Sequence, residues 1–110
     1  MLRVVDEIVE LAPVLEAQAK VIARHSPELA KQLRKAWPRV MCNVNEGMHR
    51  MGGKRTNRFD DAMGEAREAH GVLRYALACG FIEGEQPKWA LDRVDKITAT
   101  LYKLAHRRRR

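Results

Sequence analysis

Apolar residues recur along the chain at alternating steps of three and four, a spacing that places them on one face of an α-helix. The clearest example lies between residues 59 and 77 and comprises Phe59, Met63, Ala66, His70, Leu73 and Leu77. Such a narrow apolar stripe is typical of helices that pack lengthwise on near-parallel neighbours. Three other segments repeat it, so the pattern predicts four amphipathic helices.

The first predicted helix spans residues 2–24, with Pro13 expected to bend it. Its apolar positions are Val5, Ile8, Ala12, Leu15, Ala19 and Ile22. The second helix starts at Ser26-Pro27, because serine is a favoured N-cap and proline a favoured first residue. Its apolar face is Leu29, Leu33, Trp37, Val40, Val44 and Met48, with a kink expected at Pro38. The fourth helix opens at Pro87 and carries Ala90, Val94, Ile97, Leu101 and Leu104.

Short connections join these helices. Met51-Gly52-Gly53 is predicted to form a tight turn, after which the third helix runs from Thr56 or Asn57 to Cys79. Gly80 suits the left-handed position that ends a helix. The sequence therefore predicts an all-α protein, an antiparallel up-down-up-down four-helix bundle over residues 1–105, followed by a basic tail at residues 106–110.

Composition agrees with one soluble domain of 110 residues, 45% hydrophobic and 32% charged. No apolar run approaches the roughly 18 residues of a membrane span, and acidic residues interrupt the N-terminal segment where a signal peptide needs an apolar core. We therefore expect a cytoplasmic protein without membrane contact. Cys42 and Cys79 are expected to be buried and too far apart for a disulfide.

The net charge of +7 is unevenly distributed. Residues 1–19 sum to −3, residues 20–58 to +8, residues 59–105 to −2, and residues 107–110 to +4. A concentrated basic patch favours a polyanionic partner such as nucleic acid. The alternative is that the charge only keeps the protein soluble.

Candidate reaction centres are weak. Glu46 and His49 have the Glu-x-x-His spacing of di-iron bundles, but no second such motif is present, so no metal site and no cofactor are expected. Gly47, Gly52-Gly53 and Lys54 resemble a phosphate loop but lack its lysine placement and its preceding strand. His70 lies on the apolar stripe, which favours a core or interface role over catalysis. We expect no enzyme.

Two carboxylates lie among apolar helical positions. Glu46 and Glu68 are each expected either to pair with an arginine (Arg34, Arg50 or Arg74) or to face water.

Several motifs together resemble a known family. They are Asn43-Val-Asn-Glu46-Gly47, Arg50, Phe59, Ala62-Met-Gly64, Glu68, Leu73, Ala76 and Gly80-Phe-Ile82, within about residues 5–82. They are similar to the small four helix bundle proteins first noticed within intervening sequences of bacterial large-subunit ribosomal RNA genes. The resemblance implies a homo-oligomer, a five-membered ring. It also implies kinship with accessory proteins of diversity-generating retroelements, which bind nucleic acid and a reverse transcriptase.

The leading hypothesis is therefore a non-enzymatic, oligomeric bundle that binds RNA or DNA by charge and shape. The residues expected to contact phosphates are Lys31, Arg34, Lys35, Arg39, Arg50, Lys54, Arg55, Arg58, Arg107, Arg108, Arg109 and Arg110. The alternative is a protein-binding adapter, for example for a reverse transcriptase. It predicts an exposed apolar surface around Trp37, Trp89 and Tyr102.

Overall fold

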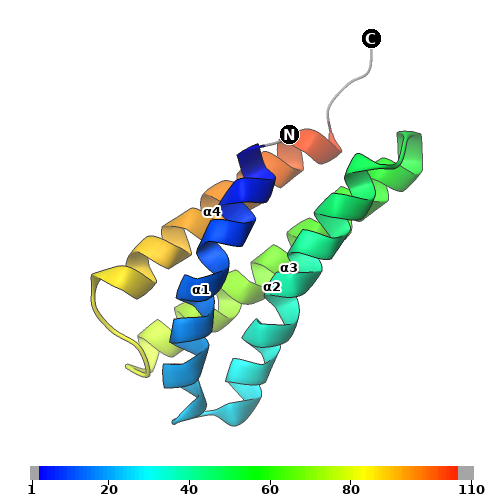
Figure 1. Cartoon of the computed structure of the whole chain (residues 1–110). Coiled ribbons are helices and arrows are strands. Elements are labelled where there is room, and N and C mark those ends of the chain that lie inside the picture. The colour runs from blue at the N-terminus through cyan, green and yellow to red at the C-terminus, as the bar shows by residue number, and fades with distance from the viewer. Residues whose placement is uncertain (1–2, 107–110) are drawn as a thin grey trace.

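The computed structural model describes residues 3–106, which fold into four helices. They are α1 (Arg3–Ala23), α2 (Pro27–Met48), α3 (Gly52–Ala78) and α4 (Glu85–Ala105). Successive helices run in opposite directions, and α4 packs back on α1 to close the bundle (Figure 1). The body measures 48 × 23 × 20 Å. The predicted antiparallel four-helix bundle is confirmed.

The core consists largely of the predicted stripes. Its largest fully buried side chains come from all four helices and include Ile8, Leu33, Phe59, Leu73 and Leu101. The stripe of α1 was wrong at one position, because Ala12 is exposed and Leu11 is buried. This helix packs against both α2 and α4, so its buried face is wider than a two-position seam.

Two polar contacts that are at least partly buried tie α1 to its neighbours. The indole Nε1 of Trp37 on α2 donates to the backbone carbonyl of Ile8 at 2.9 Å. On the other side Gln18 donates to the side-chain carbonyl of Gln86 on α4 at 3.0 Å. α1 continues as one helix through Pro13. The first helix is therefore fixed in register on both sides by side chains that its sequence pattern alone did not reveal.

Helix ends follow the predicted chemistry in two places. The hydroxyl of Ser26 accepts a hydrogen bond from the Leu29 amide at 3.2 Å, as an N-cap does. After α3, Gly80 adopts a φ of 75°, and the Phe81 amide donates to the Ala76 carbonyl at 2.9 Å. This arrangement satisfies carbonyls at the end of the helix, and glycine adopts it without the steric cost of a Cβ.

Other expectations were wrong. The third helix begins at Gly52, four residues before Thr56, because Met51 in extended conformation already completes the turn. The two cysteines are free and exposed rather than buried. Cys79 caps the end of α3, and Cys42 lies on the outer face of α2 between stripe positions. None of the four helices within residues 3–105 has the length and apolarity that crossing a bilayer requires.

Candidate nucleic-acid interface

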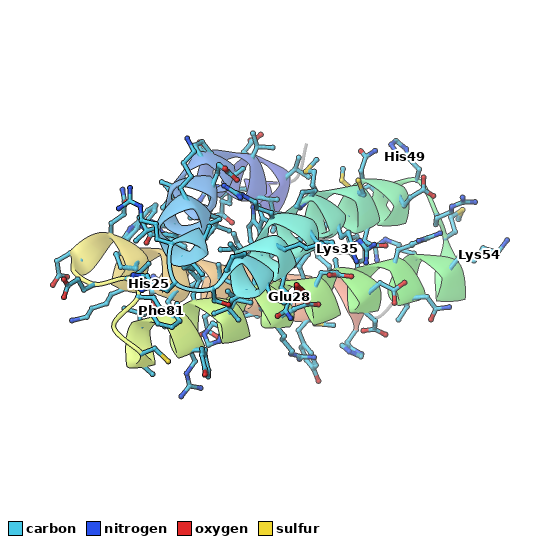
Figure 2. All side chains as sticks on the ribbon, turned by 90° about the horizontal axis from the view of Figure 1, so that it is seen from below. His25, Glu28, Lys35, His49, Lys54 and Phe81 are labelled. Carbon is cyan, nitrogen blue, oxygen red and sulfur yellow. The ribbon has the colours of Figure 1, made fainter. Side chains whose placement is uncertain are left out.

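The α2–α3 connection forms one pole of the bundle, called here the hairpin tip (residues 46–58). It projects past the end of α4 (Figure 1). Figure 2 shows His49 and Lys54 at this pole, while His25 and Phe81 lie at the opposite one. Met51 at the turn is 71% exposed, although it is a large apolar residue. The tip is the most accessible place at which the predicted cations gather.

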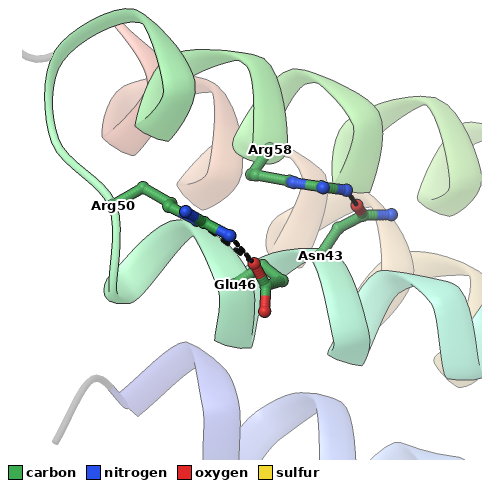
Figure 3. A network of polar contacts seen from close by, with 4 residues as sticks. All are labelled: Asn43, Glu46, Arg50 and Arg58. Carbon is green, nitrogen blue, oxygen red and sulfur yellow. Dashed lines mark hydrogen bonds and ion pairs between the residues drawn. The ribbon is translucent and has the colours of Figure 1, made fainter.

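Two arginines of the tip are held by partners on α2 (Figure 3). Arg50 donates through Nε and Nη2 to one carboxylate oxygen of Glu46, at 3.2 and 2.9 Å. Arg58 on α3 donates through Nη1 to the side-chain carbonyl of Asn43 at 3.3 Å. The hydrogen bonds from Arg50, reinforced by its positive charge, hold the pKa of the Glu46 carboxyl below its usual value. Glu46 thus remains ionised and keeps Arg50 in place.

Gly47 explains how the two helices approach so closely beside this network. A Cβ at this position would lie 3.3 Å from the Arg58 Cβ and 3.3 Å from two atoms of the Phe59 ring. The Phe59 ring is completely buried. The motif around residues 43–50 therefore combines a close helix contact with two side chains that orient arginines.

The other two cations of the tip, Arg55 and Lys54, differ in the contacts that they make. The Arg55 guanidinium donates to the Leu104 carbonyl at 3.2 Å and lies 4.7 Å from the centre of the Phe59 ring. It therefore caps the C-terminal end of α4, where a positive charge is favourable. Lys54 is exposed and forms no ion pair with any residue between 3 and 106. The structure brings all four predicted tip cations to one pole, with Arg55 partly occupied by a structural contact.

The outer face of α2 carries four of the predicted cations, called here the basic stripe: Lys31, Arg34, Lys35 and Arg39. All four are exposed, but the stripe is less positive than its sequence indicates. Arg34 forms a two-pronged ion pair with Glu16 of α1, with distances of 3.0 and 2.8 Å. This contact lowers the pKa of Glu16 and raises that of Arg34. Arg39 lies 3.7 Å from Glu65 of α3. Only the lysines at positions 31 and 35 lack an ion pair with the described residues.

An acidic groove adjoins this stripe. Four carboxylates of α3 line it together with Arg39, Asn43 and Gly64, namely Asp60, Asp61, Glu65 and Glu68. A polyanion laid across α2 towards α3 would meet these charges. Glu68 is exposed and has no ion pair within residues 3–106, whereas Glu46 has found one of its proposed partners, Arg50. The carboxylates of this groove therefore make the stripe a less favourable surface for phosphates than its four cations alone would indicate.

The sequence also suggested the terminal arginines, a metal site and an exposed aromatic surface as candidates. The four terminal arginines, Arg107 to Arg110, lie outside the described residues. Between residues 3 and 106, no group of three His, Cys, Asp or Glu side chains is placed to hold a metal ion. Trp37 is largely buried and reaches the surface only where it lines a groove between α1 and α2, whereas Trp89 and Tyr102 are 46% and 54% exposed as expected.

Two grooves were missed from the sequence. One, of about 370 Å³, lies between α1 and α2 and is almost entirely apolar, with walls that include Val9, Leu15, Trp37 and Met41. The other, of about 410 Å³, lies between α3 and α4 and is lined by Arg67, His70, Asp95, Thr98, Ala99, Tyr102 and Lys103. Each joins side chains of two helices, so finding them requires the register between those helices.

Comparison with known proteins agrees with this geometry. The model of the family described as 23S rRNA-intervening sequence protein matches residues 2–103. The chain belongs to this family. A crystal structure at 1.70 Å of a protein with unknown function, from the S23 ribosomal protein family of Bacteroides thetaiotaomicron, has the same fold. Its TM-score is 0.82 at 20% sequence identity, over 94% of this chain and 98% of the other. No curated protein gives a significant match.

Proposed function

We propose that this member of the 23S rRNA-intervening sequence protein family is a non-enzymatic, oligomeric nucleic-acid-binding protein. The hairpin tip contacts phosphates and recognises charge and shape rather than sequence. The observation that carries the proposal is the pair of held arginines in Figure 3. Each guanidinium uses only some of its five N–H groups on its partner, so others stay available for phosphate oxygens.

Holding these side chains in advance favours binding. A flexible arginine loses rotamer freedom when it meets a phosphate, at about 0.5–1.5 kcal/mol for each immobilised side chain. Arg50 and Arg58 have already lost part of that freedom to Glu46 and Asn43. Glu46 also cancels one charge, so the arrangement favours a defined contact over maximal attraction. Lys54 adds an unpaired charge beside them.

We further propose that the protein self-associates, and a five-membered ring is the form that the family resemblance suggests. A ring would repeat the tip around its axis and convert several weak contacts into tight binding. Analytical ultracentrifugation tests this part of the proposal directly.

Two variants with equal net charge test the tip. In the tip variant four cations become glutamine: R50Q, K54Q, R55Q and R58Q. In the control variant four exposed cations nearer the opposite pole, none in an ion pair with the described residues, become glutamine: K20Q, R24Q, R74Q and K88Q. Both proteins lose the same charge, and glutamine keeps a helix propensity similar to that of arginine and lysine. Circular dichroism establishes that both remain helical.

Binding to labelled RNA and duplex DNA is then measured across a salt series. The slope of log K against log salt reports the number of phosphates neutralised, about 0.9 per contact for duplex DNA and about 0.7 for single strands. We expect the tip variant to bind more weakly and with a slope reduced by about 2–4. The control variant should keep the wild-type slope. Equal losses in the two variants would show that total charge, and not the tip, determines binding.

The apolar groove between α1 and α2 favours a second candidate, a protein-binding adapter whose partner could be a reverse transcriptase. Its wall includes Val9, which is 55% exposed. Contact through such a groove survives high salt, because apolar burial does not depend on charge screening. Capture of a partner that persists at high salt and is lost in Val9→Asp would favour the adapter. Salt-sensitive capture that Val9→Asp leaves intact would exclude the groove.

A further inference from the structure

We propose that the groove between α3 and α4 binds an unpaired nucleotide of a single-stranded nucleic acid, with the base stacked on Tyr102. The inference rests on the proposed function, because it extends the same interface to a second surface. It also narrows the ligand from nucleic acid in general to strands with unpaired bases.

The first observation is the ring itself. Tyr102 is 54% exposed and lines the groove between α3 and α4. Its ring centre lies 4.3 Å from that of His106, which in turn lies 3.8 Å from an Asp60 carboxylate oxygen. His106 does not line the groove, so the tyrosine remains open on the groove side. A supported aromatic ring beside a recess is the kind of platform on which single-stranded bases stack.

The second observation is the charge around the ring. Lys103 follows Tyr102 on α4, and Arg67 faces it from α3 across the groove. Both cations are exposed, and neither forms an ion pair with a residue between 3 and 106. They can therefore meet the phosphates that flank a stacked base. Asp95 lies in the same groove and repels phosphate, but its carboxylate can accept a hydrogen bond from a base amino group or a ribose hydroxyl.

These features distinguish single strands from duplexes. A groove of about 410 Å³ has room for one base, and a base enters it only when it is not stacked inside a helix. Removing a base from a duplex costs a few kcal/mol, whereas an unpaired base lacks its pairing partner already. The hairpin tip, by contrast, meets phosphates that both kinds of strand present. Wild-type protein should therefore show an additional contribution from Tyr102 only with single strands.

The experiment compares three variants on two probes across a salt series that begins at low salt. The variants are Tyr102→Ala, Tyr102→Phe and Tyr75→Ala. Tyr75 is the matched control, because it is another tyrosine of the bundle, 59% exposed, that does not line the groove. The probes are a short labelled single strand without self-complementarity and the duplex formed with its complement. Both tyrosines are more than half exposed and neither belongs to the buried core, so folding is expected to survive and is checked by thermal unfolding.

Tyr102→Ala should weaken single-strand binding by about 5- to 100-fold, the range expected for losing one base–aromatic stack. Binding to the duplex should change less than about 2-fold, and the salt slope should stay the same because no charge is removed. Tyr102→Phe keeps the aromatic face and should bind like wild type, as should Tyr75→Ala. This pattern would establish Tyr102 as a stacking residue.

Three results would overturn the inference. If Tyr102→Ala binds the single strand as well as wild type does, the groove plays no part, although the tip proposal stands. If Tyr102→Ala loses the same affinity for the single strand and for the duplex, Tyr102 acts on the fold or on phosphate contacts and not by stacking. If polyglutamate displaces the single strand as effectively as unlabelled oligonucleotide does, the groove recognises acidic polymers without bases. Wild-type protein that binds neither probe would overturn the proposed function as well.

Discussion

Gly47 offers the sharpest test of how the hairpin tip is built. In the interior of a helix, replacing glycine by alanine normally stabilises the fold by about 0.5–1 kcal/mol, because glycine loses more backbone entropy on folding. At Gly71 on α3 nothing lies within 4 Å of an added Cβ. Gly71→Ala should therefore gain this stabilisation in full. It is the control.

At Gly47 the same gain is opposed by steric contact. The new methyl group would lie 3.3 Å from three carbon atoms, two of them on the fully buried Phe59 ring and one on Arg58. Such separations require α2 and α3 to move apart by a few tenths of an ångström. Overpacking of this kind typically costs about 1–3 kcal/mol. The net expectation for Gly47→Ala lies between no change and a loss of about 2 kcal/mol.

Urea unfolding of both variants beside wild type measures these differences. We expect Gly71→Ala to unfold at a higher urea concentration than wild type. The unfolding free energy of Gly47→Ala should be lower than that of Gly71→Ala by about 1–3 kcal/mol. Nucleic-acid affinity should also fall in Gly47→Ala, since the displaced Arg58 would lose its contact with Asn43. If Gly47→Ala is as stabilised as Gly71→Ala, close approach of the helices does not explain this glycine. The account of the tip would then need another basis.

Three further predictions concern the bundle itself. Ser26→Ala removes the N-cap of α2 and should cost about 1 kcal/mol in thermal or urea unfolding, with Ser26→Asp retaining the stability. Trp37→Phe removes the donor to the Ile8 carbonyl and should cost about 1 kcal/mol by the same measurement; an unchanged midpoint would mean that this bond contributes nothing net. The pKa of Glu16 is lowered in the folded state by its hydrogen bonds to Arg34, so its contribution to stability is present above the unfolded value of about 4.3 and is lost as the pH falls through the folded value. Urea midpoints measured from pH 6 down to pH 3 should therefore fall less steeply in Glu16→Gln than in wild type, and parallel curves would show that the pair does not stabilise the fold.

The fold could be predicted because its determinants are local. A spacing of three and four residues, the N-cap at Ser26 and the glycine at position 80 each act within a few neighbours along the chain. Burial was predicted wrongly for residues whose surroundings include a second helix. Leu11 is buried because α4 lies beside α1. Trp37 was predicted both on the apolar face of α2 and in an exposed surface, and it is buried with its indole donating to Ile8 of α1. Neither contact can be read from the periodicity of one helix.

The sequence predicted which basic residues form the candidate site, but not which of them already have partners in the folded protein. Counting charges indicated a basic patch, whereas the free energy of a phosphate contact depends on which cations already have partners. Pairing across helices engages Arg34 and places Arg39 beside Glu65. Among residues 3–106 it gives Lys54 no ion pair. These pairings depend on the registers between helices, which cannot be read from the sequence.

The same registers explain why binding should concentrate at one pole and not along the stripe of α2. The α2–α3 hairpin extends beyond the end of α4 (Figure 1). The middle of α2, in contrast, lies between Glu16 on one side and the acidic groove of α3 on the other. A phosphate at the tip therefore meets arginines that Asn43 and Glu46 orient, while a phosphate on the stripe meets opposing charges of nearly equal number. Replacing Glu65 and Glu68 by lysine should accordingly raise the affinity of the stripe for nucleic acid. The part of the binding free energy that the tip supplies should not change. If the stripe and the tip bind phosphates independently, the salt slope should steepen in this variant. It should steepen by the same amount when the four tip cations are already glutamine.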